Sequence, residues 1–442
     1  MAGRGLIVAA PASGSGKTLV TLGLLRHLRR RGLRVAAAKA GPDYIDPGFL
    51  AAASGAECVN LDAWAMRPRR LASLVQGLED AADLVVCEGV MGLFDGAGAS
   101  GDAGSTANLA RFTGWPVVLA VDVARQGASV AALVRGFTEH DPEVRIAGVI
   151  LNRIGGARHR AIIEAALCRH LPALGRYGSL PRDPRLALPS RHLGLVLAEE
   201  NGNLDALIED AAAAVGNNLD IAALVAAARP SRIPRMGPVA GLPPLGRRIA
   251  VARDEAFAFV YGSVLSDWVR GGVELELFSP LADEAPCARA SAVYLPGGYP
   301  ELHAGRLAAA SRFLDGLRDF AADGKPVYGE CGGYMVLGET LVDGTGTEHR
   351  MAGLLPVATS FAEPRLHLGY RQAALLADHP FGSAGDRFRG HEFHYAAASR
   401  QGPAQPLFLL RDSEDAKLDE AGMMRGGVSG SFIHLIDSAA ED

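Results

Sequence analysis

The stretch GLIVAAPASGSGKT, residues 5–18, determines the fold class expected for the first half of the chain. It begins with a short apolar run typical of a buried β-strand, passes through a Gly- and Ser-rich loop, and ends where a helical pattern begins. A loop of this composition between a strand and a helix is typical of a phosphate-binding P-loop. The stretch therefore predicts a parallel α/β domain with a nucleotide site at one sheet edge.

Apolar runs and helical patterns alternate through the rest of this half. The apolar character of the runs is continuous rather than alternating, which indicates a parallel sheet covered on both faces. We expect strands at 5–10, 34–39, 83–88, 116–122 and 145–152, and helices near 17–31, 69–80, 127–139 and 158–170.

A proline-rich stretch separates the two halves of the chain. Residues 229–248 carry five prolines without any periodicity, as a linker does. After it the α/β alternation resumes, with strands expected at 248–254, 273–280, 291–298 and 326–330 and a helix near 304–323. We predict two α/β domains, residues 1–230 with the P-loop and residues 247–442, joined by a linker at 231–246.

The bulk composition fits a globular enzyme of two or three domains, because 49% of the 442 residues are apolar and 21% are charged. The net charge is −5 and both signs are scattered, which argues against nucleic acid as a partner. Five cysteines without a C-x-x-C pair favour a reducing compartment over a disulfide framework or a zinc site. No apolar run reaches membrane-spanning length, so we expect a cytoplasmic protein without membrane contact.

The P-loop predicts an ATP site with magnesium. Lys17 is placed to reach the terminal phosphates and Thr18 to ligate Mg²⁺, and only four of the 44 basic residues are lysine, which argues against an incidental Lys17. The strict motif has glycine where this chain has Pro11, so the loop is a variant, and a Gly/Ser loop with a chance lysine is the alternative. The expected ATP contacts are Ser13, Gly14, Ser15, Gly16, Lys17, Thr18 and Asn152, the last of which would read the adenine edge or be a simple loop residue.

Two further segments follow strands at the same sheet edge. They are KAGPDYIDP, residues 39–47, and EGVMGLFDG, residues 88–96. We expect Asp43 and Glu88 to complete the oxygen ligands of Mg²⁺, and Lys39 to neutralise a transferred phosphoryl group or hold a substrate carboxylate. The alternative for each aspartate is a turn former beside proline or glycine.

A second site is predicted at PVYGECGGYM, residues 326–335. Cys331 falls between a strand and a helix among small residues, which parallels the nucleophile elbow, where the helix N-terminus favours a thiolate. His434 is the expected base, and the expected oxyanion hole is formed by Gly297, Gly298 and Gly332. The alternative is that Cys331 is a buried small hydrophobe. The segment RGHEFHY, residues 389–395, shows no convincing metal-ligand spacing and predicts a strand that borders a site.

These motifs together resemble a known family. The elbow with the late histidine is similar to a class I glutamine amidotransferase domain of the subtype fused to corrinoid-amidating enzymes. The segments APASGSGKT, KAGPDYIDP, EGVMGLFDG and VILNRIG resemble the dethiobiotin-synthetase-like ATP domain of the same enzymes. The resemblance covers nearly the whole chain and points to the a,c-diamide synthases of cobalamin biosynthesis.

The resemblance implies amidation of the a- and c-acetate carboxylates of hydrogenobyrinic or cobyrinic acid, through acyl phosphates and ammonia released at Cys331. The implied partners are a corrinoid tetrapyrrole, ATP and glutamine, with Mg²⁺ as cofactor, and a homodimer is among the expected assemblies. His434 would raise the nucleophilicity of Cys331. The residues implied on the substrate side are Lys39, Tyr44, Asp46 and Asp95.

The chain departs from ordinary class I domains at the acid of the catalytic triad. Those domains carry His-x-Glu, whereas here Ile436 stands two residues after His434, and Asp437 one further on is not an assumed replacement. We therefore predict slow glutamine hydrolysis.

Three readings compete with this one. A nickel-sirohydrochlorin or cobyrinic acid a,c-diamide synthase, or a cobyric acid synthase, would share the motifs. A non-enzymatic P-loop ATP switch that binds a partner leaves Cys331 and His434 unexplained. A cysteine hydrolase with an idle nucleotide domain would turn over without ATP.

Overall fold

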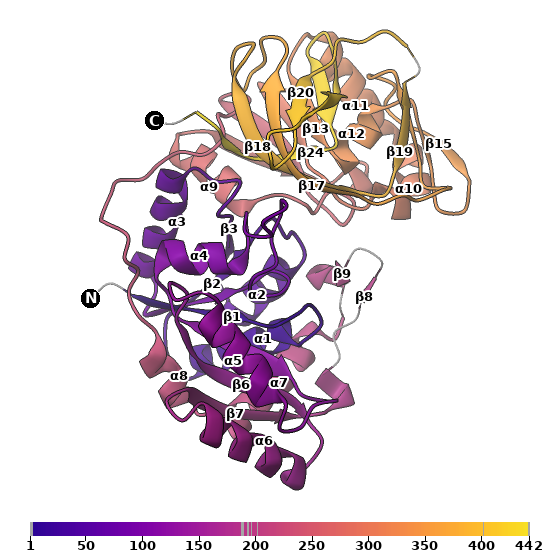
Figure 1. Cartoon of the computed structure of the whole chain (residues 1–442). Coiled ribbons are helices and arrows are strands. Elements are labelled where there is room, and N and C mark those ends of the chain that lie inside the picture. The colour runs from indigo at the N-terminus through magenta and orange to yellow at the C-terminus, as the bar shows by residue number, and fades with distance from the viewer. Residues whose placement is uncertain are drawn as a thin grey trace. The chain divides into compact units, whose positions relative to one another are not determined.

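The chain divides into two compact units in the computed structural model, which describes residues 3–186, 190–191, 194–195, 197–200, 202–400 and 402–440 (Figure 1). One unit comprises Met1–Trp64 with Pro68–Val239, and the other comprises Ala65–Arg67 with Ala240–Asp442. The division after Val239 falls inside the linker expected at 231–246. The assignment of Ala65–Arg67 to the second unit has no signature in the sequence.

A seven-stranded parallel sheet forms the centre of the first unit, in the order β3-β2-β4-β1-β5-β6-β7. All five expected strands are present, and their continuous apolar runs are buried because helices cover both faces of the sheet. The strands β3 and β7 were not predicted. The bounds are β1 (Arg4–Ala9), β2 (Val35–Ala40), β3 (Cys58–Leu61), β4 (Leu84–Glu88), β5 (Val117–Asp122), β6 (Ile146–Ile154) and β7 (Gly175–Pro181), with a short pair β8 (Ser190–Arg191) and β9 (Gly194–Leu195) outside this sheet.

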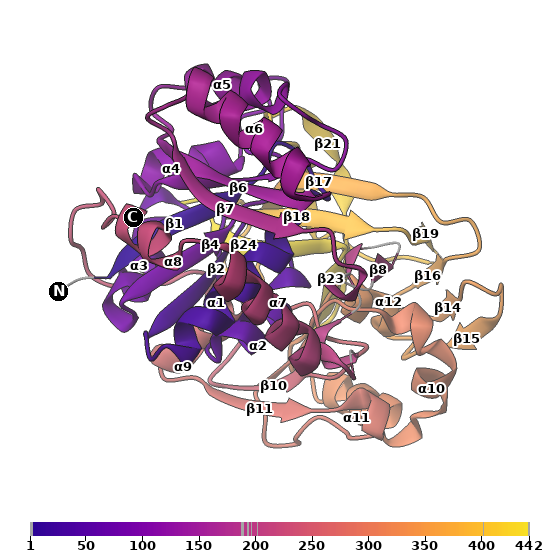
Figure 2. The same ribbon diagram turned by 90° about the horizontal axis from the view of Figure 1, so that it is seen from below.

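Helices flank this sheet in two layers. Figure 2 shows α1, α2 and α7 on one side of the strands and α5 and α6 on the other. Within the described residues, no helix is long and apolar enough to cross a bilayer. The bounds are α1 (Lys17–Arg30), α2 (Asp46–Ser54), α3 (Pro68–Ala81), α4 (Thr106–Thr113), α5 (Val130–His140), α6 (Ala157–His170), α7 (Leu204–Asn218) and α8 (Ile221–Ala227).

The linker runs along helix α3 and is fixed to it by hydrogen bonds. The amide of Met236 donates to Oε1 of Gln76 at 3.1 Å, and the amide of Val239 donates to Oγ of Ser73 at 3.1 Å. Proline has no backbone N–H group, so only the other linker residues have amides that need an acceptor. Side chains of α3 accept hydrogen bonds from two of these amides.

A six-stranded sheet, β11-β10-β12-β13-β23-β22, forms the centre of the second unit. Its strands are parallel except for β22, which pairs antiparallel with β23. The four strands expected after the linker are all present in it. The bounds are β10 (Arg248–Ala252), β11 (Glu274–Phe278), β12 (Ala292–Leu295), β13 (Val327–Glu330), β22 (Met423–Arg425) and β23 (Val428–Ser431), with helices α9 (Gly262–Arg270), α10 (Ala304–Ala309), α11 (Ser311–Ala322) and α12 (Gly332–Leu337).

Two further sheets complete this unit: an antiparallel sheet of five strands, and a mixed sheet of four strands in which β14 pairs parallel with β16. Neither was predicted, apart from the strand at 389–395, which is confirmed as part of β18. In the five-stranded sheet β21-β20-β17-β18-β24, His391 of β18 lies opposite His434 of β24. The other sheet has the order β15-β14-β16-β19. The bounds are β14 (Thr340–Val342), β15 (Glu348–Arg350), β16 (Val357–Ser360), β17 (His367–Leu375), β18 (Arg387–His394), β19 (Ala397–Arg400), β20 (Phe408–Arg411), β21 (Lys417–Ala421) and β24 (Ile433–Ser438).

Candidate active site

The loop at residues 10–16 joins β1 to the first residue of α1, as the P-loop reading requires. Gly14 and Gly16 have φ of 75° and 90°, a left-handed conformation that favours glycine. A Cβ on Gly16 would lie 2.2 Å from Nδ2 of Asn152, so a larger residue there would displace the Asn152 side chain. The loop therefore ends at a helix N-terminus, where backbone N–H groups and the helix dipole favour phosphate.

Asn152, near the end of β6, is bonded to this loop. Its buried Nδ2 donates to the carbonyl oxygen of Ser15 at 2.9 Å, and its Oδ1 accepts from the amide of Arg153 at 2.9 Å. Arg153 has a φ of 62°, a strained conformation of the kind that collects at functional sites. The side chain thus supports the P-loop, while its expected contact with adenine stays a prediction.

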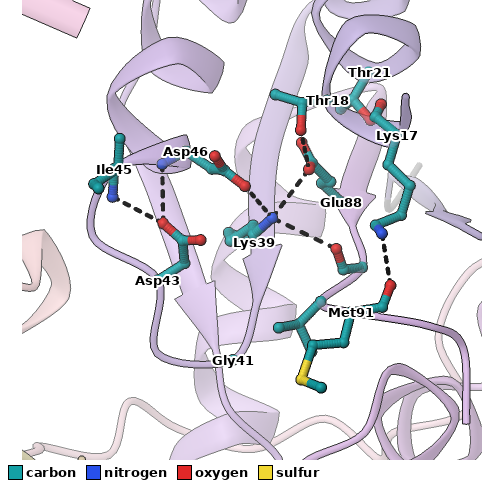
Figure 3. Close-up of polar contacts among 12 residues, drawn as sticks. Lys17, Thr18, Thr21, Lys39, Gly41, Asp43, Ile45, Asp46, Glu88 and Met91 are labelled. Carbon is teal, nitrogen blue, oxygen red and sulfur yellow. Dashed lines mark hydrogen bonds and ion pairs between the residues drawn. The ribbon is translucent and has the colours of Figure 1, made fainter. Parts of the chain in front are cut away.

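Lys17 is buried and extends from α1 to the segment after β4. Its Nζ donates to the carbonyl oxygen of Met91 at 2.6 Å (Figure 3). Met91 itself has a φ of 47°, so this carbonyl is held by a strained residue. Burial lowers the pKa of the Lys17 ammonium, against the opposing effect of Glu88.

Glu88, the last residue of β4, is fully buried and presents one satisfied and one unsatisfied oxygen. Its Oε1 accepts from Oγ1 of Thr18 at 2.8 Å and from Nζ of Lys39 at 3.0 Å. Among the described residues no group donates to its buried Oε2. Burial raises the pKa of Glu88 to about 7. A buried carboxylate oxygen with free lone pairs, beside the hydroxyl of Thr18, fits the oxygen ligands that Mg²⁺ prefers.

Lys39 lies between Glu88 and Asp46 (Figure 3). Its Nζ is 2.5 Å from Oδ2 of Asp46. Burial lowers the pKa of Lys39, but Asp46 and Glu88 outweigh that effect and the pKa lies well above the usual value. The ammonium therefore stays charged.

Asp43 accepts hydrogen bonds through Oδ1 from the amides of Ile45 and Asp46, at 2.8 and 2.9 Å. These bonds form a turn at the start of α2, which is the structural alternative considered for this residue. Burial and the neighbouring Asp46 raise the pKa of Asp43 to about 6. The role of Asp43 as a metal ligand stays a prediction.

These side chains line one cavity of about 900 Å³, within the range of small-molecule sites. A neighbouring cavity of about 700 Å³ shares Ser13, Gly14, Arg153 and Arg182 with it. The sequence did not indicate the segment at 181–186, which begins at the last residue of β7 and lines the larger cavity. Asp95, expected on the substrate side, accepts from the amide of Gly92 at 2.9 Å, and the substrate roles of Asp95 and Tyr44 stay predictions.

Cys331 lies between β13 and α12, as predicted, with φ 46° and ψ −103°. A Cβ on Gly333 would lie 2.0 Å from the carbonyl oxygen of Leu295, so the elbow packs too closely for any larger residue there. Burial, followed by the charge of Glu301, raises the pKa of the Cys331 thiol, whereas the amide of Gly332 acts in the opposite direction. The resting group is a thiol, and its use as a nucleophile requires a base.

His434 of β24 is buried beside this elbow. A Cβ on Gly297 would lie 2.4 Å from Cε1 and 3.2 Å from Nε2 of His434, and 3.2 Å from Cβ of Cys331. The imidazole and the Cβ of Cys331 therefore both lie beside Gly297, a residue that has no side chain. A Cβ on Gly332 would lie 3.0 Å from the amide nitrogen of Gly298, so the three expected oxyanion residues also gather at this point.

The acids around His434 differ from those that the sequence indicated. Both carboxylate oxygens of Asp437 bind the guanidinium of Arg67, at 3.1 Å each, and Oδ2 also accepts from the Arg67 amide at 2.8 Å. Glu330, the residue before the nucleophile, places Oε2 3.7 Å from Nδ1 of His434. The sequence indicated Glu330 only as the end of a strand. The one sequence feature that marks Glu330 as unusual is a charged residue within an apolar run.

A further cluster of possible metal ligands lies on β17 and β18 of the five-stranded antiparallel sheet. Possible metal-ligating atoms of His367, Glu392 and His394 lie within 4.8 Å of one another. The segment 389–395 alone showed no metal-ligand spacing, because His367 comes from β17. Nε2 of His394 is 3.0 Å from Oε1 of Glu392, whose Oε2 accepts from Arg371 at 2.8 Å, so these groups are held by internal bonds.

Both halves of the chain match described families. Residues 6–196 match the CobQ/CobB/MinD/ParA nucleotide binding domain, and residues 248–441 match the CobB/CobQ-like glutamine amidotransferase domain.

Several curated proteins are similar over their whole length. The hydrogenobyrinate a,c-diamide synthase of Brucella abortus biovar 1 (strain 9-941) is 54% identical over 441 residues, which is 99% of each chain. Proteins of the same name from Rhizobium meliloti (strain 1021) and Rhodobacter capsulatus are 52% and 53% identical, each over 98% of this chain and over 99% and 98% of their own.

Proposed function

The chain belongs to the hydrogenobyrinate a,c-diamide synthase family, and from that premise we propose that it amidates the a- and c-acetate carboxylates of hydrogenobyrinic acid, using ATP and the amide nitrogen of glutamine. It is a glutamine-hydrolysing carbon–nitrogen ligase. The observation that carries the proposal is the presence in one chain of a P-loop with an acidic cluster and of a cysteine elbow with a buried imidazole.

We assign activation of the carboxylate to the first unit. A carboxylate oxygen attacks the γ-phosphorus of ATP, the bond to the bridging oxygen breaks, and ADP leaves with that electron pair. The acyl phosphate then accepts ammonia at its carbonyl carbon and releases phosphate and a proton. Positioning and charge neutralisation supply most of the catalysis of such steps, here by the P-loop amides, Lys17 and Lys39.

Bound Mg²⁺ would neutralise phosphate charge, and Thr18 with Glu88 would hold it. Oε2 of Glu88 supports this assignment because it is buried without a donor among the described residues. Asp43 is the third proposed ligand. The proposed substrate side consists of Lys39, Tyr44, Asp46 and Asp95.

We assign ammonia release to the second unit. His434 removes the proton from Cys331, the thiolate attacks the side-chain amide carbon of glutamine, and the oxyanion forms beside the amides of Gly298 and Gly332. The oxyanion then collapses to a thioester as the C–N bond breaks, and the protonated imidazole gives its proton to the leaving nitrogen, which departs as ammonia. Water hydrolyses the thioester and releases glutamate, which restores the thiol.

The metal content of the corrin ring distinguishes the nearest alternatives. The three curated relatives are named for hydrogenobyrinate, the cobalt-free substrate. Their name favours hydrogenobyrinic acid over cobyrinic acid or nickel-sirohydrochlorin as the substrate of this chain. The alternative hypothesis of a P-loop switch without enzymatic activity does not explain the cysteine elbow. A cytoplasmic location and a homodimer remain predictions.

High-resolution mass spectrometry tests the proposal. The protein is incubated with ATP, Mg²⁺ and glutamine carrying heavy nitrogen in its amide, with hydrogenobyrinic or cobyrinic acid. We expect two labelled amides in the product from hydrogenobyrinic acid and little product from cobyrinic acid. A single amide, or turnover that does not require ATP, would contradict the proposal.

A further inference from the structure

Glu330 is a buried carboxylate with several donors arranged around it. It is 3% exposed; Oε2 accepts from the Tyr294 hydroxyl at 2.7 Å, and Oε1 accepts from the Tyr328 hydroxyl at 3.2 Å and the Leu435 amide at 3.1 Å. Burial, followed by the charge of Glu330, raises the pKa of both tyrosines well above the usual value, so both remain hydroxyl donors. These donors satisfy the hydrogen-bonding capacity that burial would otherwise leave unmet.

The pairing of the strands places the carboxylate of Glu330 beside the imidazole of His434. Glu330 ends β13, whereas Leu435 and His434 are neighbours on β24, so the bond from the Leu435 amide fixes Glu330 to the strand that carries His434. Nδ1 of His434 lies 3.7 Å from Oε2 of Glu330. The edge of the ring that carries Cε1 and Nε2 lies beside Gly297, and the Cβ of Cys331 lies beside the same glycine.

The other titratable groups around His434 do not supply this carboxylate. Asp437 binds Arg67, and the side chain of His391, across the strand pair, has its pKa lowered to about 3 by burial, so it is neutral. Glu301 lies near the thiol of Cys331, and Glu392 is paired with Arg371 and His394.

We propose that Glu330 is the positioning acid of the glutaminase site and replaces the glutamate that ordinary class I domains carry two residues after the histidine. Its charge holds the proton on Nδ1 of His434, which leaves Nε2 unprotonated toward Cys331, and it stabilises the imidazolium that forms during attack. The 3.7 Å separation exceeds a hydrogen bond, and it shortens when glutamine binds, as catalytic contacts commonly do. The inference rests on the proposed glutaminase role of Cys331.

The test compares E330Q and E330D with the wild-type protein, all as full-length chains. E330Q keeps the size of the side chain and removes its charge; we expect glutamine-dependent kcat to fall by about 10²- to 10⁴-fold with little change in KM for glutamine. The acidic limb of its pH–rate profile should move to lower pH, because an imidazolium without its carboxylate is a stronger acid. E330D keeps the charge, so its loss should be smaller and its acidic limb should stay near that of the wild type.

The rate at which iodoacetamide alkylates Cys331, measured against pH, gives the same comparison without turnover. The alkylation rate should fall in E330Q and change less in E330D. If E330Q does not fold, the test rests on the comparison of E330D with the wild type. Equal losses in the two variants, an unmoved acidic limb in E330Q, or E330Q activity within threefold of the wild type would overturn the role of Glu330. A wild-type protein that does not hydrolyse glutamine would instead overturn the proposed function.

Discussion

The hydroxyl of Thr18 donates a 2.8 Å hydrogen bond to Oε1 of Glu88, a residue 70 positions further along the chain. This bond connects the first residues of α1 to the end of β4, at the edge where open parallel sheets place their ligands. The P-loop and the acidic segment thereby become one site, and Glu88 is kept beside the loop although its burial costs free energy.

Replacing Glu88 should separate stability from activity. Between about pH 4.5 and 7 the folded protein retains a proton on Glu88 that the unfolded chain releases, so this residue lowers stability as pH rises through that window. The difference between the unfolding temperature of E88Q and that of the wild type, measured without nucleotide, should therefore become more positive from pH 5 to pH 8. ATP-dependent amidation by E88Q should fall by at least about 10²-fold. A relative unfolding temperature that decreases with pH would contradict the buried state of this carboxylate.

The support that Asn152 gives to the P-loop predicts a selective effect on ATP. In N152A the carbonyl of Ser15 loses its donor and the loop loses its contact with β6. We expect KM for ATP to rise about tenfold, while glutaminase activity is unchanged. The matched control is N218A, which removes a bond from an exposed asparagine to the Ala214 carbonyl on α7. Equal KM values in N152A and the wild type would show that the loop does not need this bond.

Gly297 is predicted to admit no side chain. The added methyl group of G297A would lie 2.4 Å from Cε1 of His434 and displace the imidazole from the thiol. Glutamine-dependent activity should fall by about 10²-fold, with ammonia-dependent activity retained. The control is G344A, because Gly344 has open space where its methyl group would lie. Normal glutaminase activity in G297A would place the reacting groups elsewhere.

Asp437 is predicted to stabilise the fold and not to act in catalysis. D437N leaves Arg67 buried without its charged partner, and loss of one member of such a pair costs about 3 kcal/mol of unfolding free energy. Denaturant unfolding measures this loss, with D315N in an exposed pair as the control. The glutaminase rate per folded molecule should be unchanged in D437N. A normal stability with a large loss of rate would assign Asp437 to the triad instead.

The parallel strands and the two loops of the sites were predictable from the sequence because each has a local signal. Buried parallel strands are continuous apolar runs, and a P-loop or an elbow is fixed by glycines at set positions. Several strands outside the two central sheets were missed because they are short and only half-buried, as in β21 (Lys417–Ala421).

The partners of the site residues were not predictable in the same way. The contact between Glu330 and His434 depends on the register of strands about a hundred positions apart, which no local pattern encodes. The bond from Asn152 to the P-loop is similar, since it joins residues 137 positions apart. Local patterns identified the reacting groups, whereas the folded sheets determine which groups surround them.

The most direct test of the account is the nitrogen source used by C331S, because the account divides ammonia release and carboxylate activation between two sites. The variant is assayed with hydrogenobyrinic acid, ATP and Mg²⁺, supplied either with glutamine or with ammonium chloride. We predict no amide product with glutamine and wild-type rates with ammonia. Loss of activity with both nitrogen sources, or retained activity with glutamine, would contradict the account.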